Sequence, residues 1–227
     1  MGRYFIGDLL IIIGIVISLA AQLYVNASYR KYKRVKNSKG ISGFDVAKQI
    51  LEKNGLDNIY VTETKGMLSD HYDPTRKVVR LSTEIFHGTT IASASVAAHE
   101  VGHAIQDKEG YSFMRVRSKM FPLVKFSSYA GYFAILIGVI FSMLQLIWLG
   151  IGLEIVILIF QLVTLPVEFN ASNRAKIEIR ELGILNDNEI ESSTSMLRAA
   201  AYTYVASVLT TLLQILRLIL IFADDRR

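Results

Sequence analysis

The chain of 227 residues has 52% apolar side chains and a mean hydropathy of +0.36, so it is too hydrophobic for an ordinary soluble domain. Its net charge of +5 arises largely from one basic cluster, and no nucleic-acid-binding motif accompanies that cluster, so we expect no DNA or RNA partner. The absence of cysteine excludes disulfides and thiolate ligands, so any bound metal ion must be held by imidazole or carboxylate groups.

The first apolar run, residues 9–25, is long enough to cross a membrane and is followed directly by basic side chains. These are Arg30, Lys31, Lys33, Arg34, Lys36 and Lys39. Basic residues concentrate on the cytoplasmic side of membrane helices. The pattern therefore favours a retained anchor over residues 1–28 rather than a cleaved signal peptide, and it places the following segment inside the cell.

The polar region at residues 29–120 is predicted to be a small α+β region. Ser42 with Asp45 resembles a helix cap, apolar residues follow at helical spacing, and Asn54-Gly55 ends the helix as a turn. Residues 59–62 and 77–82 are rich in β-branched side chains and flank the turn-forming run 70–74. Two short strands are therefore predicted.

The second of these strands has two interpretations. If it lies at the edge of a sheet, Val79, Arg80 and Leu81 would bind the backbone of a peptide substrate by strand addition. If it packs only for stability, these residues have no role in substrate binding. The sequence favours neither interpretation over the other.

The most informative motif is His99-Glu100-Val101-Gly102-His103, an HExxH sequence in a run of helical character that Thr90 or Ser93 would cap and that extends to about Gln106. Side chains four residues apart stand one turn above each other on a helix, so both imidazoles can reach one metal ion. Glu100 then faces the open side of the metal, where it can accept a proton from water. This arrangement is typical of a zinc peptidase.

Three further apolar runs follow, at residues 126–149, 151–167 and 202–222. The third of the four segments is short and carries Glu154, so it is the least certain span. The uncharged link 145–150 suits the outside of the cell, and the basic residues after residue 167 return the chain to the inside. We expect a membrane hairpin at 121–167, a cytoplasmic helical region at 168–201, and a last span with its tail at 202–227, although Arg226 and Arg227 weigh against an external tail.

A catalytic zinc site needs a third protein ligand, and Glu168 is the best candidate. It follows Pro166 at the inner end of the third apolar run, on the membrane face where the HExxH helix is expected, whereas Glu154 lies near the outer end. Glu178 is the second choice, and Glu168 could instead merely favour the start of a helix. His87 has no acidic companion at ligand spacing, and His71 lies in the predicted turn.

Taken together, these residues resemble a known family. The HExGH motif, the membrane hairpin and the run Leu165-Pro166-Val167-Glu168-Phe169-Asn170-Ala171-Ser172 are similar to those of the YugP-type bacterial membrane zinc metallopeptidases, which share a plan with the HtpX-type membrane proteases. The resemblance covers nearly the whole chain. It implies zinc held by His99, His103 and Glu168, with Glu100 as general base and a peptide as substrate.

One position departs from the HtpX-type pattern. Those proteins carry an aspartate four residues after the ligand glutamate, where this chain has Ser172, so Ser172 or another group must orient the ligand imidazole. A hydrogen-bond donor for the developing oxyanion is also expected. The candidates are Asn173, Arg174, Tyr202 and His71.

The sequence thus predicts a mainly α, polytopic membrane protein with four transmembrane helices and a small α+β, zincin-like catalytic region at the inner membrane surface. The predicted activity is that of a gluzincin-like zinc endopeptidase of the cell membrane whose site faces the cytoplasm and acts on membrane or membrane-proximal proteins. The alternative is a catalytically inactive membrane scaffold or regulator that retains zinc. A transporter is disfavoured because polar residues cluster outside the apolar runs.

Overall fold

The computed structural model describes residues 2–223 and divides the chain into two compact units. The first unit comprises Met1–Leu23, Arg115–Leu165 and Tyr202–Arg227, and the second comprises Tyr24–Met114 and Pro166–Ala201. Arg226 and Arg227, which bear on the predicted tail, lie outside the described residues. Each unit is therefore formed from segments that are distant in the sequence.

Among residues 2–223, four helices are long and apolar enough to cross a membrane, in agreement with the predicted number of spans. They are α1 (Gly2–Tyr32), α5 (Ser112–Ile140), α6 (Leu144–Glu181) and α7 (Asp187–Phe222). The prediction that residues 145–150 form the link of the membrane hairpin is wrong, because α6 already begins at Leu144. The turn lies just before it, where Ser142 adopts a left-handed backbone with φ of 53°.

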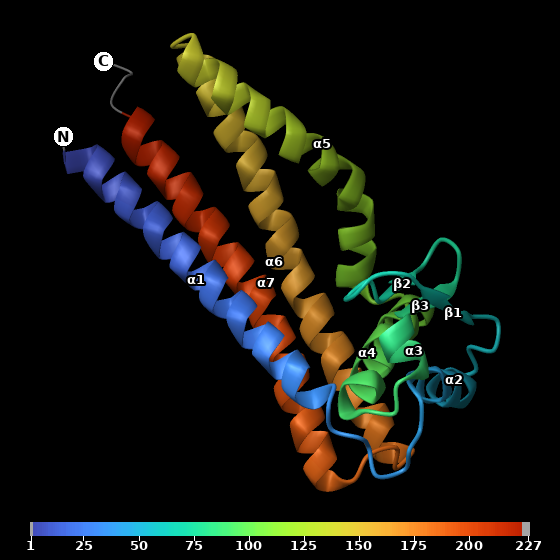
Figure 1. Ribbon diagram of the computed structural model, residues 1–227. Coiled ribbons are helices and arrows are strands. Elements are labelled where there is room, and N and C mark those ends of the chain that lie inside the picture. Colours follow the sequence, from blue (N-terminus) through green and yellow to red (C-terminus); the bar gives the residue numbers. More distant parts are fainter. Residues whose placement is uncertain (1, 224–227) are drawn as a thin grey trace. The chain divides into compact units, whose positions relative to one another are not determined.

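Helix contacts in the first unit depend on small and hydroxylated residues. On α1 and α7, which lie side by side (Figure 1), the hydroxyls of Ser18 and Thr210 are 2.8 Å apart. Between α5 and α6, a Cβ at Gly150 would lie only 2.4 Å from Cγ1 of Ile135. Lipid tails are as apolar as the helices themselves, so close packing and hydrogen bonds of this kind hold the helices together.

The first complete helix of the second unit is α2 (Gly43–Lys53), whose predicted boundaries are confirmed. The Ser42 hydroxyl accepts a hydrogen bond from the Asp45 N–H, and Gly55 leaves the helix at a φ of +60°. The strands are β1 (Tyr60–Thr64), β2 (His71–Asp73) and β3 (Val78–Ser82), followed by the helices α3 (Thr83–His87) and α4 (Ile91–Lys108). Strand β2 lies within the run that was predicted to be only a turn.

The strand order is β1-β3-β2, with β3 parallel to β1 and antiparallel to β2. The interpretation of Val79, Arg80 and Leu81 as an edge strand is therefore wrong, because β3 is paired on both sides. Residues 71–73 supply the unexpected partner, through the pairs His71 with Arg80 and Asp73 with Val78. The edge strands of this sheet are β1 and β2, and β2 is the one antiparallel to β3.

The core of the second unit lies between the sheet and the helices α2 and α4, which stand against each other (Figure 1). Val79 and Leu81 from β3, Ile50 from α2, and Ala97 and Val101 from α4 are completely buried there. The small side chains of α4 let neighbouring elements approach its backbone closely. Helix α4, which carries the HExxH motif, is thus a central element of this unit.

Candidate functional site

The two histidines of the HExxH motif lie next to each other on α4. Helix α4 is capped as predicted, because the Thr90 hydroxyl accepts a hydrogen bond from the Ser93 N–H. The rings of His99 and His103 have centroids 4.8 Å apart and planes inclined at 84°. The fixed one-turn spacing therefore brings two Nε2 atoms towards the same point.

Glu168, on α6, completes a group of three ligand atoms that all lie within 4.8 Å of one another. Its Oε2 is 3.4 Å from His99 Nε2 and 3.7 Å from His103 Nε2. Ligand atoms around a tetrahedral zinc with bonds of roughly 2.0–2.1 Å stand about 3.3 Å from each other, so the three groups fit such an ion. Two imidazoles and a carboxylate with no thiol are also the donor set of a catalytic rather than a structural zinc site.

The Nδ1 atoms of both histidines face partners on the side away from Glu168. The Ser172 hydroxyl lies 3.2 Å from His99 Nδ1, and the Oε1 atom of Gln106 lies 3.0 Å from His103 Nδ1. Ser172 was among the predicted candidates, but Gln106 was not. Its position three residues after His103 on the same helix is the only sequence signal that could have identified it.

Glu100 is 8% exposed and lies beside the ligand group. Burial raises the pKa of its carboxyl group to about 7, and the carboxylates of Glu168 and Asp70 act in the same direction. His99 and a hydrogen bond from the Tyr72 backbone N–H oppose the rise in this pKa. A cation held by the three ligands would lower this pKa and favour the ionised form, so Glu100 would be a carboxylate able to accept a proton.

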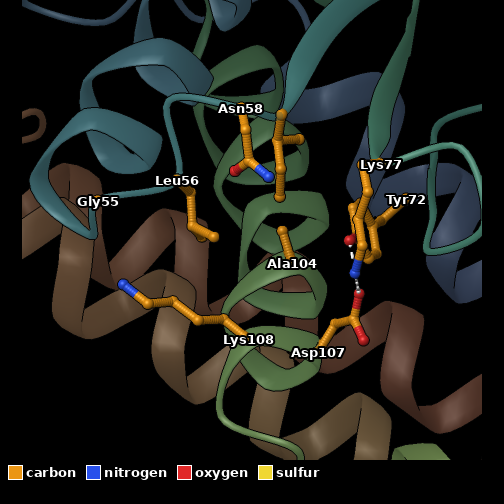
Figure 2. Close-up of a pocket in the computed structure, with 9 residues that line it drawn as sticks. Gly55, Leu56, Asn58, Tyr72, Lys77, Ala104, Asp107 and Lys108 are labelled. Atoms are coloured by element: carbon orange, nitrogen blue, oxygen red, sulfur yellow. Dashed lines mark hydrogen bonds and ion pairs between the residues drawn. The ribbon is translucent and has the colours of Figure 1, made fainter.

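Strand β2 is hydrogen-bonded to α4 at Asp107, one turn after His103. The Tyr72 hydroxyl and the Lys77 ammonium both donate to Asp107, at 2.7 Å and 2.6 Å. These groups line a hollow of about 230 Å³ with Ala104 and Lys108 (Figure 2). Since the Tyr72 N–H reaches Glu100, this anchor places the edge strand beside the predicted catalytic base.

Helix α6 lies directly against the backbone of α4 at Gly102, between the two histidines. A Cβ at this position would lie 2.7 Å from the carbonyl oxygen of Ala171, which is backbone and cannot rotate away. Ala171 precedes Ser172 and follows Glu168 by less than one turn of α6. The glycine of the motif therefore allows the third ligand to reach the histidines.

The other predicted site residues lie outside this group. Arg174 donates two hydrogen bonds to the Glu109 carboxylate, at 2.9 Å and 2.6 Å, and thereby lowers the pKa of Glu109. Asn173 is exposed, and the His71 ring is bonded to the Ser69 carbonyl oxygen. Tyr202 belongs to the first unit, whereas the ligand group belongs to the second. Glu178 forms an ion pair with Lys53 and is not one of the three clustered ligands.

His87 has an acidic companion that the sequence did not suggest. Its Nε2 lies 3.3 Å from Glu63 Oε2, and both side chains are largely exposed. Neither residue belongs to the three-ligand group formed by the described residues. This pair is therefore a surface contact.

The fold and the three-ligand site define a membrane zinc metallopeptidase. The model of the family described as "Putative neutral zinc metallopeptidase" matches residues 8–223. The chain is also 45% identical over 210 residues to the "Putative membrane protease YugP" of Bacillus subtilis (strain 168), an alignment that covers 92% of this chain and 93% of that protein. The chain belongs to this family of neutral zinc metallopeptidases. No solved structure matches it.

We predict that Gly102→Ala weakens zinc binding by at least tenfold, because the added methyl group forces α6 away from α4 and displaces Glu168. Zinc affinity is measured by competition with a chromophoric chelator. Gly152→Ala is the matched control, since a Cβ at Gly152 meets nothing within 4 Å. Unchanged zinc affinity in Gly102→Ala would show that the close approach of the two helices does not position the ligand.

Proposed function

We propose that the protein is a membrane-embedded endopeptidase that binds zinc through His99, His103 and Glu168 and hydrolyses peptide bonds of membrane or membrane-proximal proteins. The observation that carries this proposal is the convergence of the three ligand atoms within 4.8 Å, with Glu100 buried beside them. A scaffold that merely retained zinc would need no buried carboxyl group next to the ligands. Such a group is costly to bury and is typical of a general base.

In this mechanism Glu100 is the residue that moves protons. A zinc ion in such a site supplies a Lewis acid that polarises the scissile carbonyl and makes water a stronger acid. Glu100 accepts a proton from the attacking water and later delivers it to the nitrogen of the leaving amine. Burial raises the pKa of this carboxyl group in the metal-free site, whereas a bound cation would lower it and favour the ionised form that accepts the proton.

The edge of β2 is the proposed docking strand for the substrate backbone. It is the antiparallel edge of the sheet, it is held to α4 by Tyr72, and its Tyr72 N–H reaches Glu100. An extended peptide that adds to this edge would pass next to the catalytic base. Because the Tyr72 N–H is bonded to Glu100, the main-chain hydrogen bonds to the substrate would come from other backbone groups along this edge, and they would leave the enzyme tolerant of substrate sequence.

The placement of Glu168 in the chain supports substrates close to the bilayer. Glu168 comes three residues after Leu165, which ends the second segment of the first unit, and both residues lie on the continuous helix α6. The basic cluster after the first span favours a cytoplasmic location for the second unit. We therefore propose that peptide bonds near the inner membrane surface are cleaved.

The substitution Glu100→Gln should retain zinc at unchanged stoichiometry and lower kcat by about 10²- to 10⁴-fold, because the amide cannot accept the proton from water. Peptidase activity is measured on a casein-like substrate, and bound zinc is measured by elemental analysis. Full activity in this variant would exclude Glu100 as the base. Absence of cleavage by the unaltered protein, with zinc bound, would support the scaffold alternative.

Docking on β2 predicts an alternating response to N-methylation of a peptide substrate. Successive residues of an extended strand point their N–H groups to opposite sides, so methylation should raise KM by about tenfold or more at every second position only. KM is measured for a series of peptides, each with one N-methyl group away from the scissile bond. An even response along the series would contradict strand addition.

The proposed orientation is testable because the chain has no cysteine. Lys65→Cys lies in an exposed loop of the second unit, and Met143→Cys lies at the turn between α5 and α6. A membrane-impermeant maleimide should label Met143→Cys in intact cells and Lys65→Cys only after permeabilisation. The reverse result would place the metal-binding unit outside the cytoplasm.

A further inference from the structure

The side-chain amide of Gln106 links the ligand His103 to helix α6 through hydrogen bonds. Gln106 is completely buried, and its Nε2 donates to the carbonyl oxygen of Val167 at 2.8 Å and to Asn170 Oδ1 at 2.9 Å. Asn170 Oδ1 also accepts a hydrogen bond of 2.7 Å from Arg174 Nε. One buried side chain on α4 thus joins His103 to the turn of α6 that carries Glu168.

The donor and acceptor roles in this series of hydrogen bonds are fixed by groups that can only donate or only accept. A guanidinium group can only donate, so Arg174 requires the oxygen of the Asn170 amide on its side. A backbone carbonyl can only accept, so Val167 requires the nitrogen of the Gln106 amide. Both constraints turn the Gln106 oxygen towards His103, and Nδ1 must then be the protonated nitrogen of that ring.

We propose that Gln106 is a positioning residue that holds His103 in the tautomer with hydrogen on Nδ1, and that Asn170 and Arg174 keep the Gln106 amide from turning over. This inference rests on the proposed zinc site. In that tautomer Nε2 carries the free electron pair, and Nε2 is the atom that lies 3.7 Å from the Glu168 carboxylate. Gln106 therefore prepares His103 for the metal and fixes the helix of the third ligand at the same time.

His99 is held in a different way. Its Nδ1 faces the Ser172 hydroxyl, which can rotate and can either donate or accept a hydrogen bond. A hydroxyl therefore does not impose a tautomer, whereas the amide of Gln106 does. The two ligand histidines differ in how far the protein itself determines their protonation.

Zinc titration of Gln106 variants tests the proposal without reading peptidase activity. In a Glu100→Gln background, Gln106→Met should raise the Kd for zinc by about 10- to 100-fold, because the thioether cannot orient the imidazole. Gln106→Glu should stay within about threefold of the parent Kd, because a carboxylate still accepts the Nδ1 proton. Its metal-free form should nevertheless melt at a lower Tm, because the carboxylate faces the Val167 carbonyl without a donor. Gln49→Met, at an exposed position of α2, is the matched control for the substitution.

A second pair of variants tests the end of the hydrogen-bond chain at Arg174 and disturbs the core less. Arg174→Met removes the donor to Asn170 from a side chain that is 21% exposed and should raise the Kd for zinc about two- to fivefold. Glu109→Gln weakens the ion pair of Arg174 but leaves its Nε donor in place, so the Kd should not change.

The outcomes separate the inference from the proposed function. If the parent binds zinc but Gln106→Met and Arg174→Met bind it equally well, the positioning role is wrong. If the zinc affinities of Gln106→Met and Gln106→Glu fall together in proportion to their Tm, Gln106 acts only by packing. If the parent binds no zinc, the proposed metal site itself is wrong, and the role of Gln106 falls with it.

Discussion

The close approach of α4 and α6 is the constraint on which the site depends. The two histidines are fixed relative to each other by one helical turn, but Glu168 is distant in sequence and must be brought to them by packing. Gly102 allows this, because any side chain there would meet the Ala171 backbone. Small residues along α4 and the completely buried Gln106 serve the same contact. A site made from two helices therefore requires the helices to pack closely, with no side chain at the position where Gly102 meets the Ala171 backbone.

The electrostatics of the site provide a second constraint. Glu100 and Glu168 are both buried, at 8% and 3% exposure, and the Glu168 carboxylate disfavours ionisation of Glu100, whereas His103 and His99 favour the ionised form of Glu168. Two carboxylates in a poorly solvated site repel each other unless a cation or a proton compensates their charge. The pKa of Glu100 is raised mainly by burial, and Glu168 and Asp70 add a smaller repulsive contribution. Binding of a divalent cation would offset this repulsion, so metal affinity and the stability of the second unit should be coupled.

Features set by neighbouring residues in the sequence were mostly predicted correctly, whereas several features that depend on residues distant in the sequence were not. Local signals located the cap of α2 at Ser42 and limited that of α4 to Thr90 or Ser93, of which Thr90 is the cap, and hydropathy located the four spans. The strand β2 was missed because three residues within turn-forming sequence carry no strand period and become a strand only by pairing with β3. For the same reason the sequence left open whether β3 is an edge strand, and only its pairing on both sides excludes that interpretation. Gln106 was missed because its role depends on Val167 and Asn170, which only the tertiary structure brings near it.

The partners of the ligand histidines explain how the chain can function without the aspartate of the HtpX-type pattern. His99 faces the hydroxyl of Ser172 and His103 faces the amide of Gln106, so both imidazoles are oriented by neutral groups. A carboxylate partner would make an imidazole a stronger ligand, but it would also add negative charge to a site that already holds Glu100 and Glu168, with Asp70 nearby. Neutral partners orient the imidazoles without adding to this charge. Neutral residues thus orient the imidazoles, and carboxylates compensate the charge of a bound cation. A metal in this site would then retain the electrophilic character that peptide hydrolysis requires.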